Sequence, residues 1–341
     1  MSQRASPPRG AGYEAAPNIA LVKYWGMRDD RLVLPNNSSL SMTVNRLRTR
    51  TWVRFDPSLS ADRLWLNEQP AAPGPLQAVV DFLDLVRTEA GISACADVRS
   101  HNNFQIASGL ASSASGFAAL AGAASAAAGL DLSPRELSRL ARRGSGSASR
   151  SIFGGFVEWQ AGHRADGNDC YARPLFPPDH WPELRDLVVM VANAPEKRVR
   201  SARAMQDTVR TSPGYPERLR TVPKRLTAIR GALRRRSADR FFDLVIQECD
   251  DFRSVCETTV PSLDYLTPTS RAVLANVLEL NREAGHPVAG YTHDAGAHVH
   301  VFTLQEYAPL VRNRLQSIPG VAAMELLAPG PPAQRISPGG R

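Results

Sequence analysis

The sequence predicts an α+β protein, and three observations lead to this class. Its 341 residues are 43% hydrophobic, which is enough to bury the core of one large domain or two modest ones. Segments typical of strands and helices follow one another in irregular order, whereas a doubly wound sheet alternates them regularly. No apolar run reaches the roughly 18–20 residues that cross a bilayer, so a membrane-spanning protein is excluded.

The first half combines strands with two helices rich in small residues. Residues typical of strands, bounded by turn residues, predict three strands, at Thr49–Phe55, Leu64–Leu66 and Ile152–Trp159. Helical spacing predicts a helix over Asp81–Ala90. Ser115–Ala128 is almost entirely Ala, Gly and Ser, so this helix must pack backbone-close against a neighbour. Ser133 begins a capping box for a further helix that ends at Gly144.

The second half opens with a buried strand at Leu187–Ala192 and then becomes mostly helical. The predicted helices are Arg200–Val209, Glu217–Arg235, Ala238–Cys256 and Thr269–Ala284, the last of which stops at Gly285. Two short strands near Ala289–Thr292 and Val299–Thr303 follow, and then a helix from Gln305.

The two patterns are interrupted at Phe176–Leu184 (FPPDHWPEL), which predicts a boundary between an N-terminal domain of residues 13–180 and a C-terminal domain of residues 181–328. Residues 1–12 and 329–341 are rich in Pro, Gly and Arg without periodicity, and we expect both to be disordered. The first residues also lack the apolar segment of a secretory signal.

Charge and cysteine usage restrict the partners and the compartment. The net charge of +8 comes from basic residues spread along the whole chain, so we expect no nucleic-acid partner, although the charge can help attract an anionic metabolite. The four cysteines show neither a CxxC pair nor zinc spacing. They predict reduced thiols in a cytoplasmic protein.

One candidate site segment is Ala16–Asn45, where Lys23 precedes two aromatic residues and a polar Asn-Asn-Ser-Ser stretch. It fits either a strand with a snorkelling lysine or a lysine beside a polar reaction centre. A second candidate is Ser108–Ser115 (SGLASSAS), which runs into the alanine-rich helix. Its small residues and the unpaired N–H groups of a helix start favour a phosphate, but a tight turn is an equal alternative. The loop matches neither the Walker A nor the GxGxxG pattern.

Two further segments carry charged residues in turns. Gly144–Gly155 (GSGSASRSIFGG) contains Arg150, which could bind a carboxylate or phosphate through paired N–H hydrogen bonds or could simply be exposed to solvent. Tyr291–Val299 (YTHDAGAHV) contains Asp294, either a general base or an ordinary turn residue. The nearby His293, His298 and His300 could hold a metal, but their spacing fits no standard site, so we expect none.

Taken together and in this order, these segments resemble the diphosphomevalonate decarboxylase family of the GHMP kinase superfamily. The matching stretches are NIALVKYWG (Asn18–Gly26), LPNNSSLSMTV (Leu34–Val44), SGLASSASGFAAL (Ser108–Leu120), SRLARRGSGSASRSIFGGFVEW (Ser138–Trp159) and DAG (Asp294–Gly296). The likeness extends from about residue 14 to residue 305.

The resemblance implies a GHMP-kinase-type two-domain fold with the active site in the inter-domain cleft. It also implies a homodimer that takes ATP, Mg²⁺ and a phosphorylated 3-hydroxy acid. The family phosphorylates the tertiary 3-hydroxyl of mevalonate 5-diphosphate and eliminates phosphate and CO₂ to give isopentenyl diphosphate.

The resemblance also implies residue roles. Asp294 would deprotonate or orient the hydroxyl, Lys23 would lie beside it, and Arg150 would hold the carboxylate that is lost. The loop residues Ser108, Gly109, Leu110, Ala111, Ser112 and Ser113 would cradle the ATP phosphates, with Ser113 also on Mg²⁺. The substrate contacts would come from Asn18, Tyr24, Ser145, Ser147 and Ser201.

This chain departs from the family around the 5-diphosphate. Met27 replaces the last lysine of the usual KYWGK, and Ala202 replaces the arginine after Ser201. Gln105 stands where the family has a proline before the phosphate loop, and Ala297-His298 stands where the family has Pro-Asn after DAG. Nearby cations could replace the lost contacts, namely Arg28, Arg198, Arg200 and Arg203. The alternatives are therefore the same chemistry on mevalonate 5-phosphate or another 3-hydroxy acid, and a non-catalytic binding protein with this fold.

Overall fold

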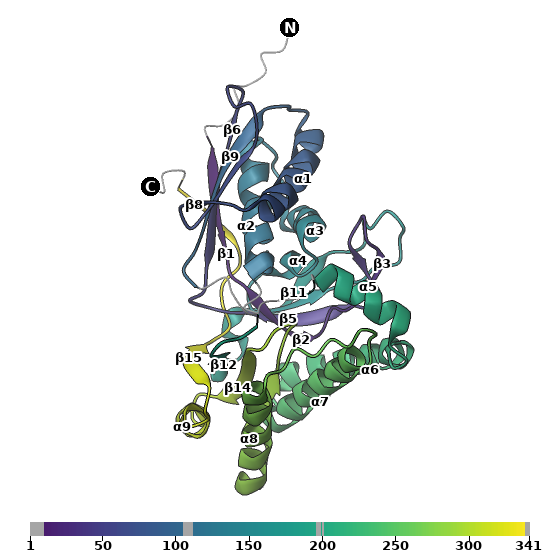
Figure 1. Ribbon diagram of the computed structural model, residues 1–341, viewed down its shortest axis with the longest axis vertical. Coiled ribbons are helices and arrows are strands. Elements are labelled where there is room, and N and C mark those ends of the chain that lie inside the picture. Colours follow the sequence, from purple (N-terminus) through teal and green to yellow (C-terminus); the bar gives the residue numbers. More distant parts are fainter. Residues whose placement is uncertain (1–9, 105–111, 196–198, 200, 338–341) are drawn as a thin grey trace.

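The computed structural model describes residues 10–104, 112–195, 199 and 201–337, and arranges them as three main sheets with helices packed around them (Figure 1). The first sheet forms the upper part of the molecule and is antiparallel except where β7 pairs with β9. In sheet order its strands are β16 (Gln334–Ile336), β1 (Ala11–Ala15), β6 (Thr49–Asp56), β9 (Cys95–Asn102), β7 (Arg63–Leu66) and β8 (Gln69–Pro70).

Helices cover one face of this first sheet (Figure 1). They are α1 (Pro73–Ala90) and α2 (Ser112–Ala127), and α3 (Pro134–Gly144) packs against both of these helices. Along β6 buried residues alternate with exposed or half-buried ones, so one face of the strand points to the core. α2 lies directly on β1, where an added Cβ on Gly122 would come within 2.4 Å of the Tyr13 ring. The small residues of α2 are therefore required by its close approach to the sheet.

The second sheet lies in the middle of the molecule and leads into the candidate site. Its order is β11 (Ala172–Phe176), β10 (Phe156–Trp159), β5 (Ser39–Thr43) and β2 (Asn18–Val22). Every residue of β2 and β5 is buried, because helices contact this sheet from above and below (Figure 1). The short helix α4 (Ala148–Ser151) lies above it. A small hairpin of β3 (Met27–Asp29) and β4 (Leu34–Pro35) extends from the end of β2.

The third sheet forms the lower part of the molecule with the remaining helices. Its order is β13 (Ala289–Thr292), β14 (Val299–Leu304), β12 (Leu184–Val191) and β15 (Val321–Leu327). The helices are α5 (Ser201–Thr211), α6 (Tyr215–Arg235), α7 (Ala238–Glu257), α8 (Pro268–Ala284) and α9 (Ala308–Gln316), and a 3₁₀ turn, η1, lies at Pro178–His180.

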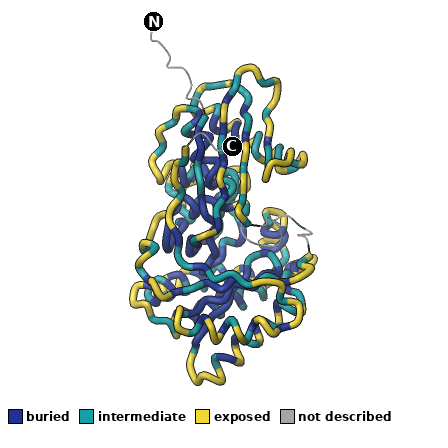
Figure 2. The backbone as a smooth tube through the Cα atoms, turned by 90° about the vertical axis from the view of Figure 1, so that its left-hand side faces the viewer, coloured by how far each residue is buried: buried dark blue, intermediate teal, exposed yellow. Residues whose placement is uncertain are grey.

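One apolar core joins the middle and lower parts. It contains Leu21 of β2 and Met42 of β5 together with Val188 of β12 and Phe241 of α7. Figure 2 shows buried backbone continuing through the centre of the molecule, with exposed segments at its periphery. Residues before and after position 180 therefore pack against each other, which fixes the loops of both halves relative to one another.

Most predicted elements are present, with boundaries shifted by a few residues. The strand over residues 289–292 and the helix that ends at Gly285 are confirmed. The prediction over Ile152–Trp159 is partly wrong, because the strand begins only at Phe156 and the preceding Ser-rich segment forms α4. β9 was not predicted, since its sequence CADVRSHN alternates too weakly in hydrophobicity.

The expectation of disordered ends is wrong where the structure describes them. Ala11 and Gly12 belong to β1, and Gln334–Ile336 forms β16, which pairs antiparallel with β1. β16 is held by backbone hydrogen bonds to the edge of β1, and such bonds do not depend on an apolar side-chain pattern. Within the described residues, no helix combines the length and the apolar character needed to cross a bilayer.

Candidate active site

A cavity of about 140 Å³ lies where the upper and lower parts of the molecule meet. Its lining comprises Asn18, Ala20, Lys23, Tyr24, Trp25, Ser113, Ser145, Ser147, Arg150, Ser201, Met205, Phe252, Asp294 and Ala295. The structure thus brings most of the sequence-predicted site residues together around one space. Of the others, Ser112 lines a neighbouring pocket, and Ser108, Gly109, Leu110 and Ala111 lie outside the described residues.

Lys23 and Asp294 form an ion pair in this cavity. Lys23 follows β2 directly and Asp294 follows β13, and the Nζ and Oδ1 atoms are 2.9 Å apart. The lysine side chain is 3% exposed and also donates a hydrogen bond to the carbonyl of Ala20. A buried ammonium needs a counter-ion, and the same attraction keeps the carboxylate ionised. The pair therefore provides a charged carboxylate that can accept a proton.

Arg150 is buried in α4 and is held in place by neutral groups. Its Nε donates to Asn18 Oδ1 at 3.1 Å and to Ser41 Oγ at 3.0 Å, and its Nη1 donates to Ser39 Oγ at 2.6 Å. Burial lowers the pKa of Arg150 to about 10, although Asp294 and Tyr24 oppose this shift. The guanidinium thus stays charged at neutral pH, and it faces a cavity suited to an anionic ligand.

Serine hydroxyls and Tyr24 form another part of the cavity wall. Ser113 Oγ lies 3.4 Å from Ser145 Oγ, which is 3.2 Å from Ser147 Oγ. Burial raises the pKa of the Tyr24 phenol, so this group stays neutral and can donate a hydrogen bond. An added Cβ on Gly146 would lie 2.7 Å from the Tyr24 ring, so the close approach of the Gly-Ser loop requires glycine there.

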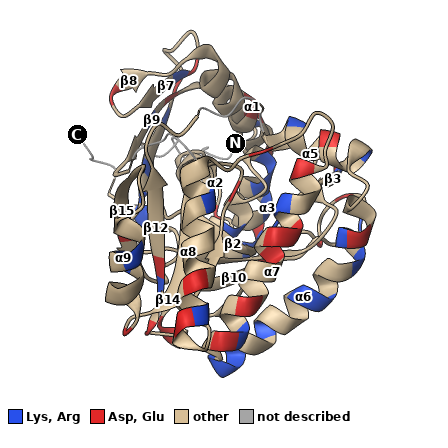
Figure 3. Ribbon diagram, turned by 60° about the horizontal axis from the view of Figure 1, so that its bottom comes forward, with Lys and Arg blue, Asp and Glu red and all other residues tan. Residues whose placement is uncertain are grey.

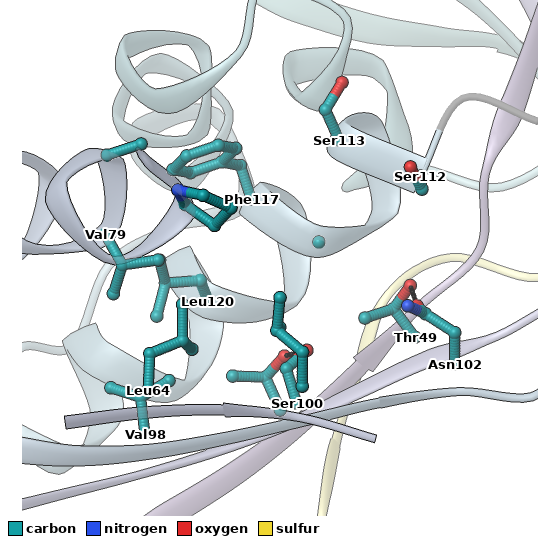
Figure 4. Close-up of a pocket in the computed structure, with 15 residues that line it drawn as sticks. Thr49, Leu64, Val79, Val98, Ser100, Asn102, Ser112, Ser113, Phe117 and Leu120 are labelled. Atoms are coloured by element: carbon teal, nitrogen blue, oxygen red, sulfur yellow. Dashed lines mark hydrogen bonds between the residues drawn. The ribbon is translucent and has the colours of Figure 1, made fainter. Parts of the chain in front are cut away.

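A second, more apolar pocket of about 270 Å³ adjoins the serine side of the cavity. Figure 4 shows Leu64, Val79, Val98, Phe117 and Leu120 around it, with Ser112 and Ser113 on the first turn of α2. The unpaired N–H groups at a helix start attract phosphate, and an apolar slot accepts a planar base. The combination can hold a nucleotide with its phosphates toward the cavity.

The three histidines form no shared metal site in the described structure. His293 Nδ1 lies 2.8 Å from the Asp294 carbonyl, His298 Nδ1 accepts the Val191 N–H, and His300 Nδ1 contacts Asp186 Oδ2 at 2.8 Å. The search of the described residues finds no group of three His, Cys, Asp or Glu placed to hold a metal ion. Burial lowers the pKa of His293 and His298 to about 4, so both are neutral near pH 7.

Sequence reasoning missed several residues that complete the cavity. Ser39 and Ser41 hold Arg150, and their alternation on one face of a buried strand is a signal that could have found them. Phe252 lies with its ring centroid 6.0 Å from Lys23 Nζ, within reach of a cation–π contact. Trp25 donates its indole N–H to Thr208. No local sequence pattern marks Phe252, because it lies on a helix far along the chain.

The positions that depart from the family bring no replacement cation among the described residues. Met27 packs in an apolar cluster with Trp25 and Met205. Arg28 donates to backbone carbonyls, and Arg203 pairs with Asp207. Arg198, Arg200 and Gln105 lie outside the described residues. In the described part of the cavity lining, the cations are therefore Lys23 and Arg150.

The site thus joins a lysine–carboxylate pair and a buried, charged arginine to an apolar pocket at the start of a helix. The class of protein that this fold and site define is an enzyme that transfers a phosphoryl group to a hydroxylated acid.

Comparisons with known proteins agree with this class. Residues 15–172 match the diphosphomevalonate decarboxylase-like N-terminal domain, and residues 187–331 match the mevalonate 5-diphosphate decarboxylase C-terminal domain. The diphosphomevalonate decarboxylase of Ganoderma lucidum is 42% identical over 86% of this chain and 78% of its own length. The human diphosphomevalonate decarboxylase is 39% identical over 86% of this chain and 76% of its own length. The chain belongs to the diphosphomevalonate decarboxylase family.

Solved structures support the same assignment. The mevalonate diphosphate decarboxylase of Enterococcus faecalis superimposes with a TM-score of 0.88 at 35% identity, over 96% of this chain and 99% of the other. The mevalonate diphosphate decarboxylase of Staphylococcus aureus superimposes with a TM-score of 0.90 at 33% identity, over 96% of this chain and 98% of the other. A related structure, described as MDDEF in complex with MVAPP, AMPPCP and magnesium, has a TM-score of 0.89 at 35% identity and covers 96% of this chain and 99% of the other. The expected GHMP-kinase-type fold is therefore confirmed.

Proposed function

We propose that this chain is an ATP-dependent decarboxylase that converts mevalonate 5-diphosphate to isopentenyl diphosphate, with ADP, phosphate and CO₂ as the other products. The observation that carries the proposal is the convergence of Lys23, Asp294 and Arg150 on one cavity. A base, a neighbouring cation and a carboxylate-binding arginine are the groups that this chemistry needs. The printed names of the relatives support the same reaction.

The first step is phosphorylation of the tertiary 3-hydroxyl. Asp294 accepts the hydroxyl proton as the oxygen attacks the γ-phosphorus of ATP, and ADP leaves with the electrons of the broken P–O bond. The Lys23 ammonium, 2.9 Å from Asp294 Oδ1, keeps the carboxylate ionised before transfer. It also balances negative charge that develops near the reacting oxygen.

The second step is elimination from the 3-phosphate. The C3–O bond breaks and inorganic phosphate leaves with its electron pair. The bond between the carboxylate carbon and C2 breaks next, and its electrons form the C2=C3 double bond as CO₂ departs. Arg150, fixed by Asn18, Ser39 and Ser41, holds the carboxylate in the orientation that elimination requires.

The nucleotide would occupy the apolar pocket beside α2, with its phosphates at Ser112, Ser113 and the loop residues 108–111 before them. Mg²⁺ prefers oxygen ligands and usually takes only one or two from the protein, because the phosphates and water supply the rest. The Ser113 hydroxyl, close to that of Ser145, fits this requirement. When bound, Mg²⁺ neutralises charge on the transferred phosphate. Tyr24, Asn18, Ser145, Ser147 and Ser201 would contact the substrate.

The remaining expectations belong to this proposal too. We propose a cytoplasmic enzyme that works as a homodimer without a nucleic-acid partner, with domains divided near residue 180. All four cysteines lie in described segments and are free thiols, which is compatible with a reducing compartment. The likeness to the family supports the homodimer.

A second candidate substrate is mevalonate 5-phosphate, because Met27 packs in an apolar cluster where the family usually has a cation. The test measures ADP and CO₂ release with ATP, Mg²⁺ and, in parallel, mevalonate, its 5-phosphate and its 5-diphosphate. Equal release of both products with the 5-diphosphate supports the proposal. A preference for the 5-phosphate identifies the second substrate, and turnover of none of the three favours a non-catalytic binding protein.

A further inference from the structure

A buried ionic cluster of Arg218 and Arg225 on α6 with Glu248 and Asp251 on α7 lies next to the cavity. The Arg218 and Glu248 side chains are 0% and 1% exposed, and Arg218 Nη2 lies 2.5 Å from Glu248 Oε1. Arg225 Nη1 contacts Glu248 Oε2 at 2.8 Å, and both arginines contact Asp251 Oδ2. Figure 3 shows acidic positions on α7 beside basic positions on α6.

This cluster binds the backbone of Lys23 directly. The Lys23 N–H donates to Glu248 Oε1 at 2.9 Å, while the Lys23 carbonyl accepts from Arg218 Nη2 at 3.5 Å and from Asn37 Nδ2 at 3.0 Å. The pairing of β2 with β5 is irregular after Ala20 and ends at Val22, so the sheet does not supply partners for residue 23. Glu248 of α7 supplies the acceptor for the N–H, and Asn37 together with Arg218 of α6 supplies the donors for the carbonyl.

The ionic character of the cluster requires a reason beyond stability. Replacing a buried ion pair by well-packed apolar residues is often neutral or stabilising, so the buried pair of Arg218 and Glu248 is weak evidence of a purely structural role. Burial alone would raise the pKa of Glu248, but the charge and hydrogen bonds of Arg218, the Lys23 amide and Arg225 outweigh it and keep that pKa below its ordinary value. An ionised Glu248 is a stronger acceptor for the Lys23 N–H than a neutral group would be.

We infer that Glu248 is a positioning residue that acts through Lys23. It fixes the backbone at the end of β2, so that the Lys23 ammonium reaches both the Ala20 carbonyl and Asp294. An error of about 1 Å in such a group can cost about a hundredfold in rate. The inference rests on the proposed function, because it assigns Lys23 a part in the reaction.

A double-mutant cycle tests the inference. We expect Glu248→Gln to lower kcat about tenfold in the wild-type background and less than twofold in a Lys23→Met background, because an effect that acts through Lys23 disappears with it. Glu158→Gln is the matched control, since Glu158 is also buried between two arginines, Arg173 and Arg230, but lies outside the cavity lining. It should change kcat by less than twofold. If Glu248→Gln does not fold, Arg225→Gln replaces it, with an expected loss of about threefold.

A second readout does not depend on activity. The chain has three lysines, so acylation by a small reagent can be followed at each one by mass spectrometry. Loosening the backbone should raise the labelling rate of Lys23 at least threefold relative to the exposed Lys224 in Glu248→Gln, but not in Glu158→Gln. Equal kcat losses in both backgrounds, or an unchanged Lys23 labelling rate, would overturn the inference. If the wild-type protein releases neither ADP nor CO₂, the proposed function fails, and the labelling experiment still decides the positioning of Lys23.

Discussion

Replacing Asp294 with asparagine removes the proton acceptor while nearly preserving its shape. A positioned general base contributes about 10²–10⁴-fold to a rate, so kcat should fall by that factor, which equals about 3–6 kcal/mol at 1.4 kcal/mol per tenfold. The Lys23 side chain is 3% exposed and would lose its carboxylate partner at 2.9 Å, which adds a stability cost of about 1–3 kcal/mol. The KM for ATP should change less than threefold, because the nucleotide pocket has its own lining.

The assay compares ADP release and CO₂ release for Asp294→Asn and the wild-type protein at saturating ATP and acid substrate. Asp250→Asn is the matched control, since Asp250 accepts from Tyr291 and pairs with Arg253 on the same half of the molecule but lies outside the cavity lining. It should retain at least half of the wild-type kcat. A near-normal kcat in Asp294→Asn would refute the assignment of the base, provided that thermal unfolding shows both variants to be folded.

Three other outcomes are expected. Arg150→Lys should lower kcat/KM for the acid substrate about 10²–10³-fold, because a lysine cannot reproduce the two parallel donors of the guanidinium that Asn18, Ser39 and Ser41 orient. Steady-state kinetics measures this loss, and a loss below threefold would contradict the role of Arg150 in binding the carboxylate. Gly116→Leu should raise the KM for ATP at least tenfold without lowering Tm, because an added Cβ meets nothing within 4 Å and the side chain would extend into the pocket beside α2. An unchanged KM would place the nucleotide elsewhere. Burial lowers the pKa of His293 and of His298 to about 4, so between about pH 6.5 and pH 4 the unfolded chain binds more protons, and the free energy of unfolding should fall as the pH is lowered through this range. His293→Phe should reduce that slope in urea unfolding, and an unchanged slope would show that His293 is not the group responsible.

Local signals in the sequence predicted those elements whose ends are determined by nearby residues. α3 is an example, because Ser133 and Glu136 form both hydrogen bonds of the capping box. α1 begins at Pro73, earlier than predicted, since its first turns are partly exposed and lack a clear apolar stripe. β9 and β16 depend on pairing with strands distant in sequence, and such pairing leaves little trace in a short segment.

The candidate site likewise combines residues that the sequence predicts with residues that only the packing of distant segments brings into contact. Motifs located Lys23, Arg150 and Asp294, and the structure places all three on one cavity, although the chain separates Lys23 from Asp294 by 271 positions. The motifs could not show what holds these residues. Glu248 lies on an ordinary amphipathic helix, and its role follows from its contact with the Lys23 backbone, which only the packing of α7 beside β2 creates.

The strand β16 has a consequence for biosynthesis. It pairs with β1 at the edge of a sheet whose other strands lie between residues 11 and 102. During translation the outer edge of β1 therefore stays unpaired until residues 334–336 have been made, after all the other strands of that sheet. An open edge is a template for pairing with another chain, so the nascent protein is exposed to aggregation for most of its synthesis. The last strand ends this exposure, and truncations before residue 334 would make it permanent.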